Sequence, residues 1–228
     1  MSEDVDYALE HQHALSICTH RLHTPVCEHN LNELVLEYLD NEGMEDVAVE
    51  FANDLGISFT KSLYLSQRTE IRNKIESGDI DAAISRINDI NPEIIDRNTK
   101  MYYFLMEHKA CELSMQIKSK CLENGINDTA PLLEEVIEFI RSELYDMALG
   151  DPLLMTHLED LLEFVIFNDQ ESAIVSKRRN LATYVNQQIL ESHGSEENKL
   201  IKMLSVIVSA EKSLKETHKF PTFAQYFT

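Results

Sequence analysis

Apolar residues recur along the chain at the spacing of amphipathic helices, most clearly between residues 30 and 57. In the first half of this stretch the positions spaced i, i+3, i+4, i+7 and i+8 are Leu31, Leu34, Val35, Tyr38 and Leu39. In the second half the apolar positions are Val47, Ala48, Phe51, Ala52 and Leu55. Asn30, with Glu33 three residues later, is the expected N-cap, and Gly43 and Gly56 are the expected helix ends. The pattern therefore predicts two short helices joined by a tight turn.

A hairpin of this size cannot bury its own apolar stripes. Segments below about 40 residues usually need disulfides, metals or association to be stable. Two solutions fit the pattern: the hairpin packs on the rest of its own chain, or it pairs with another hairpin across a two-fold interface.

The remainder of the chain repeats the helical pattern with short connections. Predicted helices cover residues 68–77, closed by Gly78; a segment capped by Asp79, with Ile80, Ala83, Ile84 and Ile87 on one face; a short one after Asn91-Pro92; and a longer one after Asn98. Residues 121–130 contain Gly, Asn and Asp and are expected to form a loop. Further helices are predicted from Pro131 to Leu144 and over 153–167, 176–192 and 199–214, the last with Leu200, Met203, Leu204, Ile207 and Val208 facing inward. We therefore expect an all-α fold of antiparallel helical hairpins.

Composition supports this class and narrows the function. Six Gly, five Pro and no Trp among 228 residues, with 43% hydrophobic content, favour a globular helical chain over a sheet protein. A formal net charge of −20 argues against binding to nucleic acid or to membranes as the main activity. Four Cys without a signal peptide, and no apolar run of 18 residues, predict free thiols in a soluble intracellular protein.

The sequence contains few candidates for chemistry. A cluster of possible zinc ligands lies near the N-terminus: His11, His13, Cys18, His20, His23, Cys27 and His29. Its spacing lacks the paired ligands of a structural zinc site, so a leading arm is the favoured interpretation. Cys111 stands at an apolar position, where an inert core thiol is expected, and phosphate-loop and hydrolase motifs are absent. We expect no catalytic, cofactor-binding or metal-binding residue, and hence a protein that acts through its surfaces and is not an enzyme.

Particular residues resemble known interaction motifs. The hairpin is similar to a LisH dimerisation motif through Leu31, Leu34, Val35, Tyr38, Leu39, Gly43, Ala48 and Phe51, although Met44 and Asp54 depart from the residues usual at their positions. Residues from Arg68 to Leu113 resemble a CTLH motif through Ile71, Ile75, Gly78-Asp79-Ile80, Ala83-Ile84, Asn91-Pro92, Asn98, Tyr102-Tyr103 and Glu112-Leu113. The segment from 130 onwards resembles a CRA domain through Val185-Asn186-Gln187-Gln188-Ile189-Leu190, the run from Lys199 to Leu204, and Phe220-Pro221.

The order of these motifs divides the chain and suggests a role. The expected units are an N-terminal arm (1–29), LisH (30–58), CTLH (65–124), CRA (130–218) and a tail (219–228). The order resembles that of scaffold subunits of the glucose-induced-degradation, or CTLH, ubiquitin ligase. That resemblance implies a non-catalytic scaffold, cytoplasmic and nuclear, whose partners are RING-bearing LisH-CTLH proteins, a Ran-binding-protein-M-like subunit and an armadillo-repeat subunit.

The same resemblance implies which residues make contact. The expected LisH dimer residues are Leu31, Leu34, Val35, Tyr38, Leu39 and Phe51. The expected partner-docking residues of CTLH and CRA are Ile71, Ile75, Ile84, Tyr102, Tyr103, Leu105, Val185 and Leu204. Two alternatives remain open: a stand-alone dimeric adaptor for cytoskeletal or signalling partners, which co-purification would distinguish, and a small metalloprotein, which metal analysis would distinguish.

Overall fold

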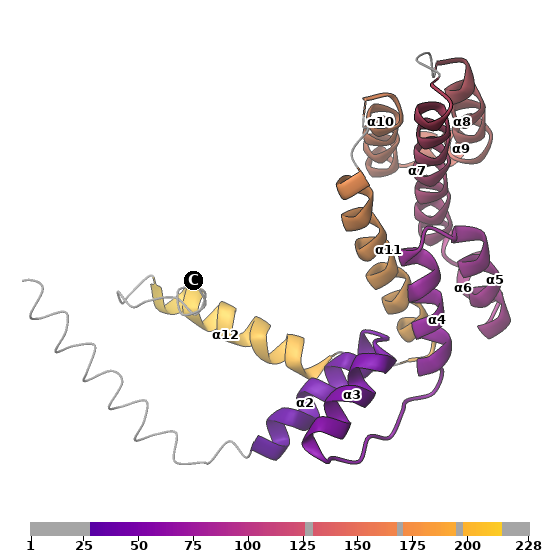
Figure 1. The fold of residues 1–228 in the computed structure, drawn as a ribbon. Helices are drawn as coiled ribbons and strands as arrows, with labels where there is room; N and C mark the ends of the chain where they lie inside the picture. The colour runs from indigo at the N-terminus through magenta and orange to yellow at the C-terminus, as the bar shows by residue number, and fades with distance from the viewer. Residues whose placement is uncertain (1–27, 126–129, 168–170, 195–197, 216–228) are drawn as a thin grey trace, which may run out of the picture.

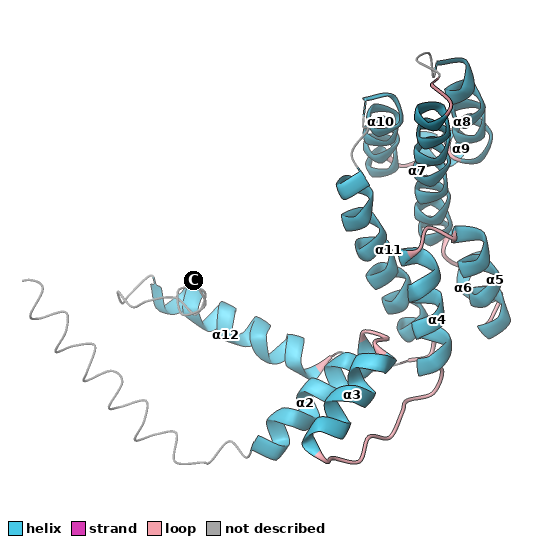
Figure 2. Cartoon of the chain, in the orientation of Figure 1, coloured by secondary structure: helices cyan, strands magenta, loops and turns pink. Residues whose placement is uncertain are grey.

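The structure is a computed structural model that describes residues 28–125, 130–167, 171–194 and 198–215. Every regular element within these ranges is an α-helix (Figure 2), which confirms the predicted all-α class. The helices are α2 (Glu28–Asn41), α3 (Glu45–Leu55), α4 (Leu65–Glu76), α5 (Ile80–Ile90), α6 (Glu93–Asp96), α7 (Thr99–Glu123), α8 (Ala130–Glu143), α9 (Tyr145–Leu149), α10 (Pro152–Phe167), α11 (Glu171–Ser192) and α12 (Lys199–Lys215). Figure 1 shows α4 to α11 as an upright column, with the α2–α3 hairpin at its base and α12 extending away from it.

The column is built around α7, the longest helix among the described residues. Its 25 residues contact α5, α6, α8, α10 and α11, so it is covered on several sides. Met101, Leu105 and Cys111 are fully buried, and the hydroxyl of Tyr103 donates a hydrogen bond to the Leu154 carbonyl of α10 at 3.0 Å. This central helix explains why the short neighbouring helices need only one apolar face each.

Several helix ends follow the predicted local chemistry. Asp79 accepts a hydrogen bond from the Ala82 N–H at 3.2 Å, and Asn98 accepts one from the Met101 N–H at 3.0 Å. Gly56 has a φ of 64°, and the Ile57 N–H donates to the Ala52 carbonyl at 2.9 Å, as expected for a Schellman end.

Other expectations were wrong. Asn30 lies inside α2, which begins at Glu28, and α11 begins at Glu171, five residues before the predicted start. The predicted inward face of α12 is not inward in this chain, because none of the described side chains of α12 is buried. The helical period was correct there, but within the described ranges no other helix buries the apolar stripe of α12.

The described residues form two apolar cores instead of one. The large core joins α4 to α11, whereas a small core lies within the hairpin and consists of Leu36, Leu39, Ala48 and Ala52. Val35, Tyr38, Met44, Phe51, Ile57 and Phe59 pack around this small core and remain partly exposed. The hairpin therefore packs as a separate unit, and no shared apolar core joins it to the column. No helix in the described ranges has the length and apolar character needed to cross a membrane.

One ionisable group in the column lacks adequate partners. The Glu107 side chain on α7 is buried, and its Oε2 accepts no hydrogen bond. The nearest cationic candidate is Nδ1 of His157 on α10, at 3.7 Å from Oε2. Burial raises the pKa of Glu107 to about 7, Lys177 opposes the shift and Asp160 adds to it.

We predict that this carboxyl group makes the stability of the column depend on pH. An unfolded Glu ionises near its ordinary pKa of 4.5, so between pH 4.5 and 7 the folded chain holds more protons than the unfolded chain. The free energy of unfolding should therefore fall as pH rises through this window, by about 3 kcal/mol in total. Urea unfolding at a series of pH values would measure it.

Glu107→Gln is the matched variant, since it keeps the shape of the side chain and removes the titration. It should flatten the pH dependence between 4.5 and 7. An unchanged slope in Glu107→Gln would contradict the assignment to this residue.

Candidate interaction surfaces

The hairpin presents part of its predicted dimer residues to solvent. Leu31 on α2 is 45% exposed, and Val47 on α3, which is not one of the predicted dimer residues, is 50% exposed. Of the other predicted dimer residues, Leu39 is buried in the hairpin core, and Leu34, Val35, Tyr38 and Phe51 are partly buried. The hairpin thus has a stable inner face and an incompletely covered outer face.

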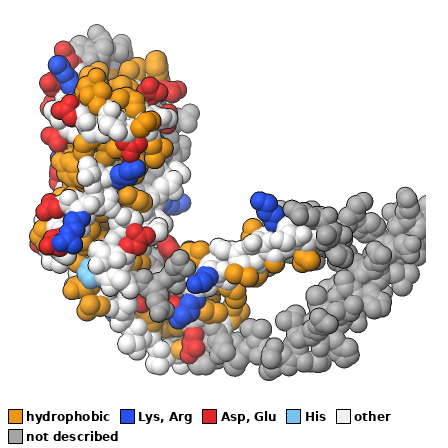
Figure 3. Space-filling model, turned by 180° about the vertical axis from the view of Figure 1, so that it is seen from behind, with side chains coloured by type: hydrophobic (Ala, Val, Ile, Leu, Met, Phe, Trp, Pro, Cys, Tyr) orange, Lys and Arg blue, Asp and Glu red, His pale blue; other side chains and the backbone are white. Residues whose placement is uncertain are grey.

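Helix α12 adds a second apolar surface beside the hairpin. Asn198 caps it, accepting hydrogen bonds from the Leu200 and Ile201 N–H groups at 3.0 and 3.4 Å, and Lys199 pairs with Glu37 of α2 at 3.0 Å. Beyond this first turn the helix stands away from the column (Figure 1), and Figure 3 shows apolar side chains along it. Its exposed large apolar residues are Ile201, Met203, Leu204, Val206, Val208 and Leu214. Among the described residues, therefore, only α2 contacts α12 closely, and most of the apolar side chains of α12 stay exposed.

The charges of the hairpin and of α12 are opposite in sign. Residues 28–60 contain nine Asp or Glu and neither Lys nor Arg. Helix α12 carries Lys199, Lys202, Lys212 and Lys215 against a single acid, Glu211. Within this chain the opposite charges already meet at the start of α12, where Lys199 pairs with Glu37 of α2.

The prediction of docking residues in the column needs a correction. Ile71, Ile75, Tyr103, Leu105 and Val185 are at most 1% exposed and belong to the large core. Side chains at these positions hold the helices together and cannot contact a partner while the column stays folded. Ile84 and Tyr102 are partly buried, the Tyr102 hydroxyl donating to Glu143 at 3.2 Å, and only Leu204 is exposed.

Exposed apolar side chains instead lie on the part of the column remote from the hairpin. The exposed members of α8, α9 and α10 are Ile137, Tyr145, Leu149, Leu153, Ile166 and Phe167. Ile137 and Ile166 fit the apolar stripe of their segments, so the sequence pattern alone would place both on inward faces.

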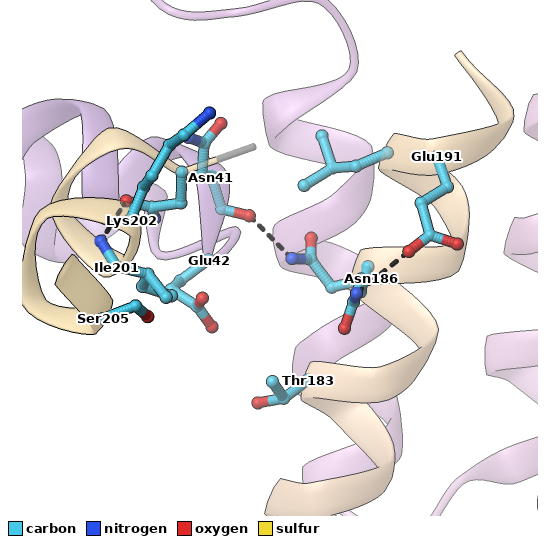
Figure 4. Close-up of a pocket in the computed structure, with 11 residues that line it drawn as sticks. Asn41, Glu42, Thr183, Asn186, Glu191, Ile201, Lys202 and Ser205 are labelled. Carbon is cyan, nitrogen blue, oxygen red and sulfur yellow. Dashed lines mark hydrogen bonds between the residues drawn. The ribbon is translucent and has the colours of Figure 1, made fainter. Parts of the chain in front are cut away.

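A set of hydrogen bonds, which we call the joint, connects the hairpin to the column. Arg68 of α4, 2% exposed, donates from Nη1 to the Asn41 carbonyl at 3.1 Å and to Asn186 Oδ1 at 2.9 Å. Its Nη2 donates to the Asp40 carbonyl at 2.8 Å and to Ser62 Oγ at 3.0 Å. Asn186 of α11 in turn donates from Nδ2 to the Asn41 carbonyl at 2.7 Å (Figure 4). The Asp40 and Asn41 carbonyls lie in the last turn of α2, where the helix supplies no hydrogen-bond donors of its own.

Neighbouring side chains complete the joint. Arg72 donates from Nε to the Glu42 carbonyl at 2.9 Å, and Thr69 donates from its hydroxyl to the Gly43 carbonyl at 3.0 Å. Gly43 has a φ of 70°, and a Cβ there would lie 3.0 Å from Asn186 Oδ1. A side chain at position 43 would therefore strain both the turn and the joint.

Burial of the Arg68 guanidinium has an electrostatic cost. Desolvation lowers the pKa of Arg68 from its ordinary value, and the Asp40 carboxylate, whose Oδ1 lies 3.5 Å from Nη2, partly offsets this effect. The Nε of Arg68 is buried and has no hydrogen-bond partner. Sequence reasoning missed the role of Arg68, although a clue existed: Arg68 stands at i−3 and i−7 from Ile71 and Ile75, on their buried stripe.

A groove of about 580 Å³ lies where the joint meets α12. Figure 4 shows Thr183, Asn186 and Glu191 of α11 on one side and Ile201, Lys202 and Ser205 of α12 on the other. Nine of the eleven residues that line it are polar or charged, although apolar atoms supply most of its surface.

The described residues show no arrangement for catalysis or metal binding that would change this picture. Burial raises the pKa of Cys111 to about 12, which fits the predicted inert core thiol. No group of three or more His, Cys, Asp or Glu in the described ranges could hold a metal ion. The His and Cys residues of the N-terminal arm up to Cys27, for which zinc was considered, lie outside the described residues.

Comparison with known families identifies the class. The model described as the CTLH/CRA C-terminal to LisH motif domain matches residues 64–215, which is more than half of the chain, and the LisH model matches residues 29–54. The chain therefore belongs to the family of proteins in which a CTLH/CRA domain follows a LisH motif. This confirms the resemblance drawn from the hairpin and column residues.

Individual relatives share one designation. The chain is 27% identical to Protein GID8 homolog of Arabidopsis thaliana over 200 residues, which are 84% of this chain and 76% of the relative. It is 28% identical to Glucose-induced degradation protein 8 homolog of Nematostella vectensis over 204 residues, covering 86% and 84% of the two chains. It is also 28% identical to GID complex subunit 8 of Schizosaccharomyces pombe over 204 residues, covering 84% and 83%.

We predict that Arg68 determines how firmly the hairpin is held. Arg68→Lys should lower the free energy of unfolding by about 2 to 4 kcal/mol, because one ammonium cannot replace the fork of bonds to three elements. The control is Arg86→Lys, whose side chain is 50% exposed and which should change stability by less than about 0.5 kcal/mol. Chemical denaturation followed by circular dichroism measures both, and equal effects would contradict the importance of the joint.

Proposed function

We propose that this chain is a non-catalytic scaffold subunit of a GID-type ubiquitin ligase assembly. Three observations support the proposal: membership of the LisH and CTLH/CRA family, relatives whose names refer to glucose-induced degradation or the GID complex, and extensive exposed apolar surface. The single observation that carries most weight is α12, an amphipathic helix in which no side chain is buried among the described residues. Surfaces of this kind are completed by partners.

In this proposal the hairpin and α12 form one composite interface with a LisH-containing partner, which is a second copy or a related subunit. The acidic hairpin of each molecule faces the lysine-bearing α12 of the other, and the apolar stripes are buried between them. The exposed apolar residues of α8, α9 and α10 then remain available for a second partner at the remote part of the column.

The partners we propose are RING-bearing LisH-CTLH proteins, a Ran-binding-protein-M-like subunit and an armadillo-repeat subunit. The chain would contribute position and not chemistry: holding a receptor-bound substrate near a charged ubiquitin carrier replaces a bimolecular encounter by an effectively intramolecular one. Such a role needs a rigid body with separated docking surfaces, and the column around α7 provides that form.

We predict that charges on α12 abolish self-association. Leu204→Glu with Val208→Glu should halve the mass in solution and leave helicity unchanged, because both side chains are exposed in the single chain and each buried carboxylate would cost several kcal/mol in an interface. Light scattering after size-exclusion chromatography measures the mass. Ile137→Glu on α8 is the control, as it is similarly exposed but remote from the hairpin, and should keep the mass of the unmodified chain.

The composition of the assembly is tested by purification of the tagged chain from its own cells at near-physiological salt, followed by mass spectrometry. Recovery of RING-bearing LisH-CTLH proteins with an armadillo-repeat subunit is the expected result. Recovery with only cytoskeletal or signalling proteins would replace the ligase scaffold by a stand-alone adaptor.

A further inference from the structure

The connection between α3 and α4 places an accessible serine at the joint. Residues 57–64 form no helix and run along the outside of the hairpin (Figure 1), and Ser62 in this segment is exposed. Its hydroxyl donates to Asp40 Oδ1 at 2.7 Å and accepts from Arg68 Nη2 at 3.0 Å. An exposed side chain is thus in direct contact with the buried cation that fixes the hairpin.

On the edge of the Arg68 guanidinium that contacts Ser62, only one of the two nitrogens has a hydrogen-bond partner. Nε and Nη2 of an arginine form the side-on fork that matches two oxygens of an anion. In this chain Arg178 shows the fork filled, with Nε and Nη2 each 2.6 Å from a carboxylate oxygen of Glu112. On Arg68 the corresponding Nε is buried without a partner, and Nη2 contacts the uncharged hydroxyl of Ser62.

The surroundings of Ser62 favour a negative charge and have room for one. The Leu65 N–H at the start of α4 donates to the Ser62 carbonyl at 3.3 Å, and no side chain caps this helix. The positive end of the helix dipole therefore lies beside Ser62. A cavity of about 200 Å³, well above the roughly 30 Å³ of one water, is lined by Ser62 and Arg68 together with Asn41, Tyr64 and His193.

We propose that Ser62 is a phosphorylation site and that the phosphate takes the Nε–Nη2 edge of Arg68 in place of the Asp40 carboxylate. The reaction needs ATP and a protein serine/threonine kinase. Ser62 Oγ bonds to the γ-phosphorus, the bond from that phosphorus to the β–γ bridging oxygen breaks, ADP leaves, and the hydroxyl proton passes to the base of the kinase.

Phosphorylation would redistribute the bonds of the joint. The phosphate brings a charge of about −1.5 to −2 at pH 7, next to a carboxylate that has just lost the Ser62 hydroxyl as a donor. Repulsion moves Asp40 away, while Arg68 gains a bidentate partner on its own side of the joint. The segment 62–68 is therefore tightened and the end of α2 is loosened, which changes how the hairpin is held. This inference concerns the chain alone and does not depend on the proposed assembly.

The first test places phosphoserine at position 62 of the full chain by genetic encoding, with phosphoserine at Ser58, on the same exposed segment, as the matched control. Phosphorus NMR gives the second pKa of each phosphate, ordinarily about 6. Contact with Arg68 should lower that of phospho-Ser62 by about one unit relative to phospho-Ser58. Arg68→Lys should remove most of the difference, and equal values in the unsubstituted chain would overturn the proposal.

Hydrogen exchange of the same proteins reports the redistribution. Phospho-Ser62 should slow amide exchange over 62–68 and accelerate it over 39–43, whereas general loosening would accelerate both and count against the proposal. As a further test, amide exchange of the Ser62→Ala variant is measured with inorganic phosphate added. If inorganic phosphate slows amide exchange over residues 62–68 as much as phospho-Ser62 does, the Nε–Nη2 edge of Arg68 binds a free anion, and the assignment to Ser62 is wrong.

Occurrence in cells is tested by phosphopeptide mapping of the chain purified from its own cells across growth conditions. A phosphate on Ser62 is expected in at least one condition. Its absence in all of them would overturn Ser62 as a modification site.

Discussion

The placement of the hairpin depends on one buried guanidinium. The hairpin and the column have separate apolar cores, so apolar packing alone does not fix the angle between them. Arg68 fixes this angle by donating hydrogen bonds to the carbonyls of Asp40 and Asn41. Asn186 accepts a hydrogen bond from Arg68 and donates one to the Asn41 carbonyl, so it holds both groups in place. Hydrogen bonds are directional, whereas apolar contacts are not, and a charged donor buried at this point tolerates few alternative arrangements. A joint of this kind gives a defined orientation at the expense of some stability.

This arrangement separates the tasks of the chain. The helices around α7 supply a stiff body, the hairpin and α12 supply one exposed surface of mixed charge, and α8 to α10 supply another. Nothing in the described ranges combines a perturbed nucleophile, a base and a cavity, and the one strongly shifted carboxyl group, Glu107, lies inside the column. A stiff body with two separate exposed surfaces is compatible with the scaffold role that we propose for this member of the LisH and CTLH/CRA family.

The sequence predicted what depends on local chemistry and failed where burial depends on distant segments. The roles of Asp79, Asn98 and Gly56 at helix ends depend only on residues within four positions of each, so the sequence was sufficient to predict them. The stripe of α12 has the same period as the buried stripe of α4, and periodicity cannot tell whether the covering surface belongs to the same chain. Ile71 and Ile75, which the family resemblance placed at a partner interface, are buried in the column, whereas Leu204, expected both on an inward face and at an interface, is exposed. Arg68 and Asn186 escaped notice because an apolar pattern assigns no role to polar residues standing on it.

The position of the two exposed surfaces at opposite parts of the column has a geometric consequence. In the assembly that we propose, one contact at the hairpin joins two molecules and a second contact at the remote part of the column joins each of them to a further subunit. If the contacts at both ends repeat, the assembly closes into a ring only if successive rotations sum to a full turn. The rotation from one molecule to the next depends on the angle between the hairpin and the column. A small change in the hydrogen bonds around Arg68 would thus alter curvature, and with it the difference between a closed particle and an open chain.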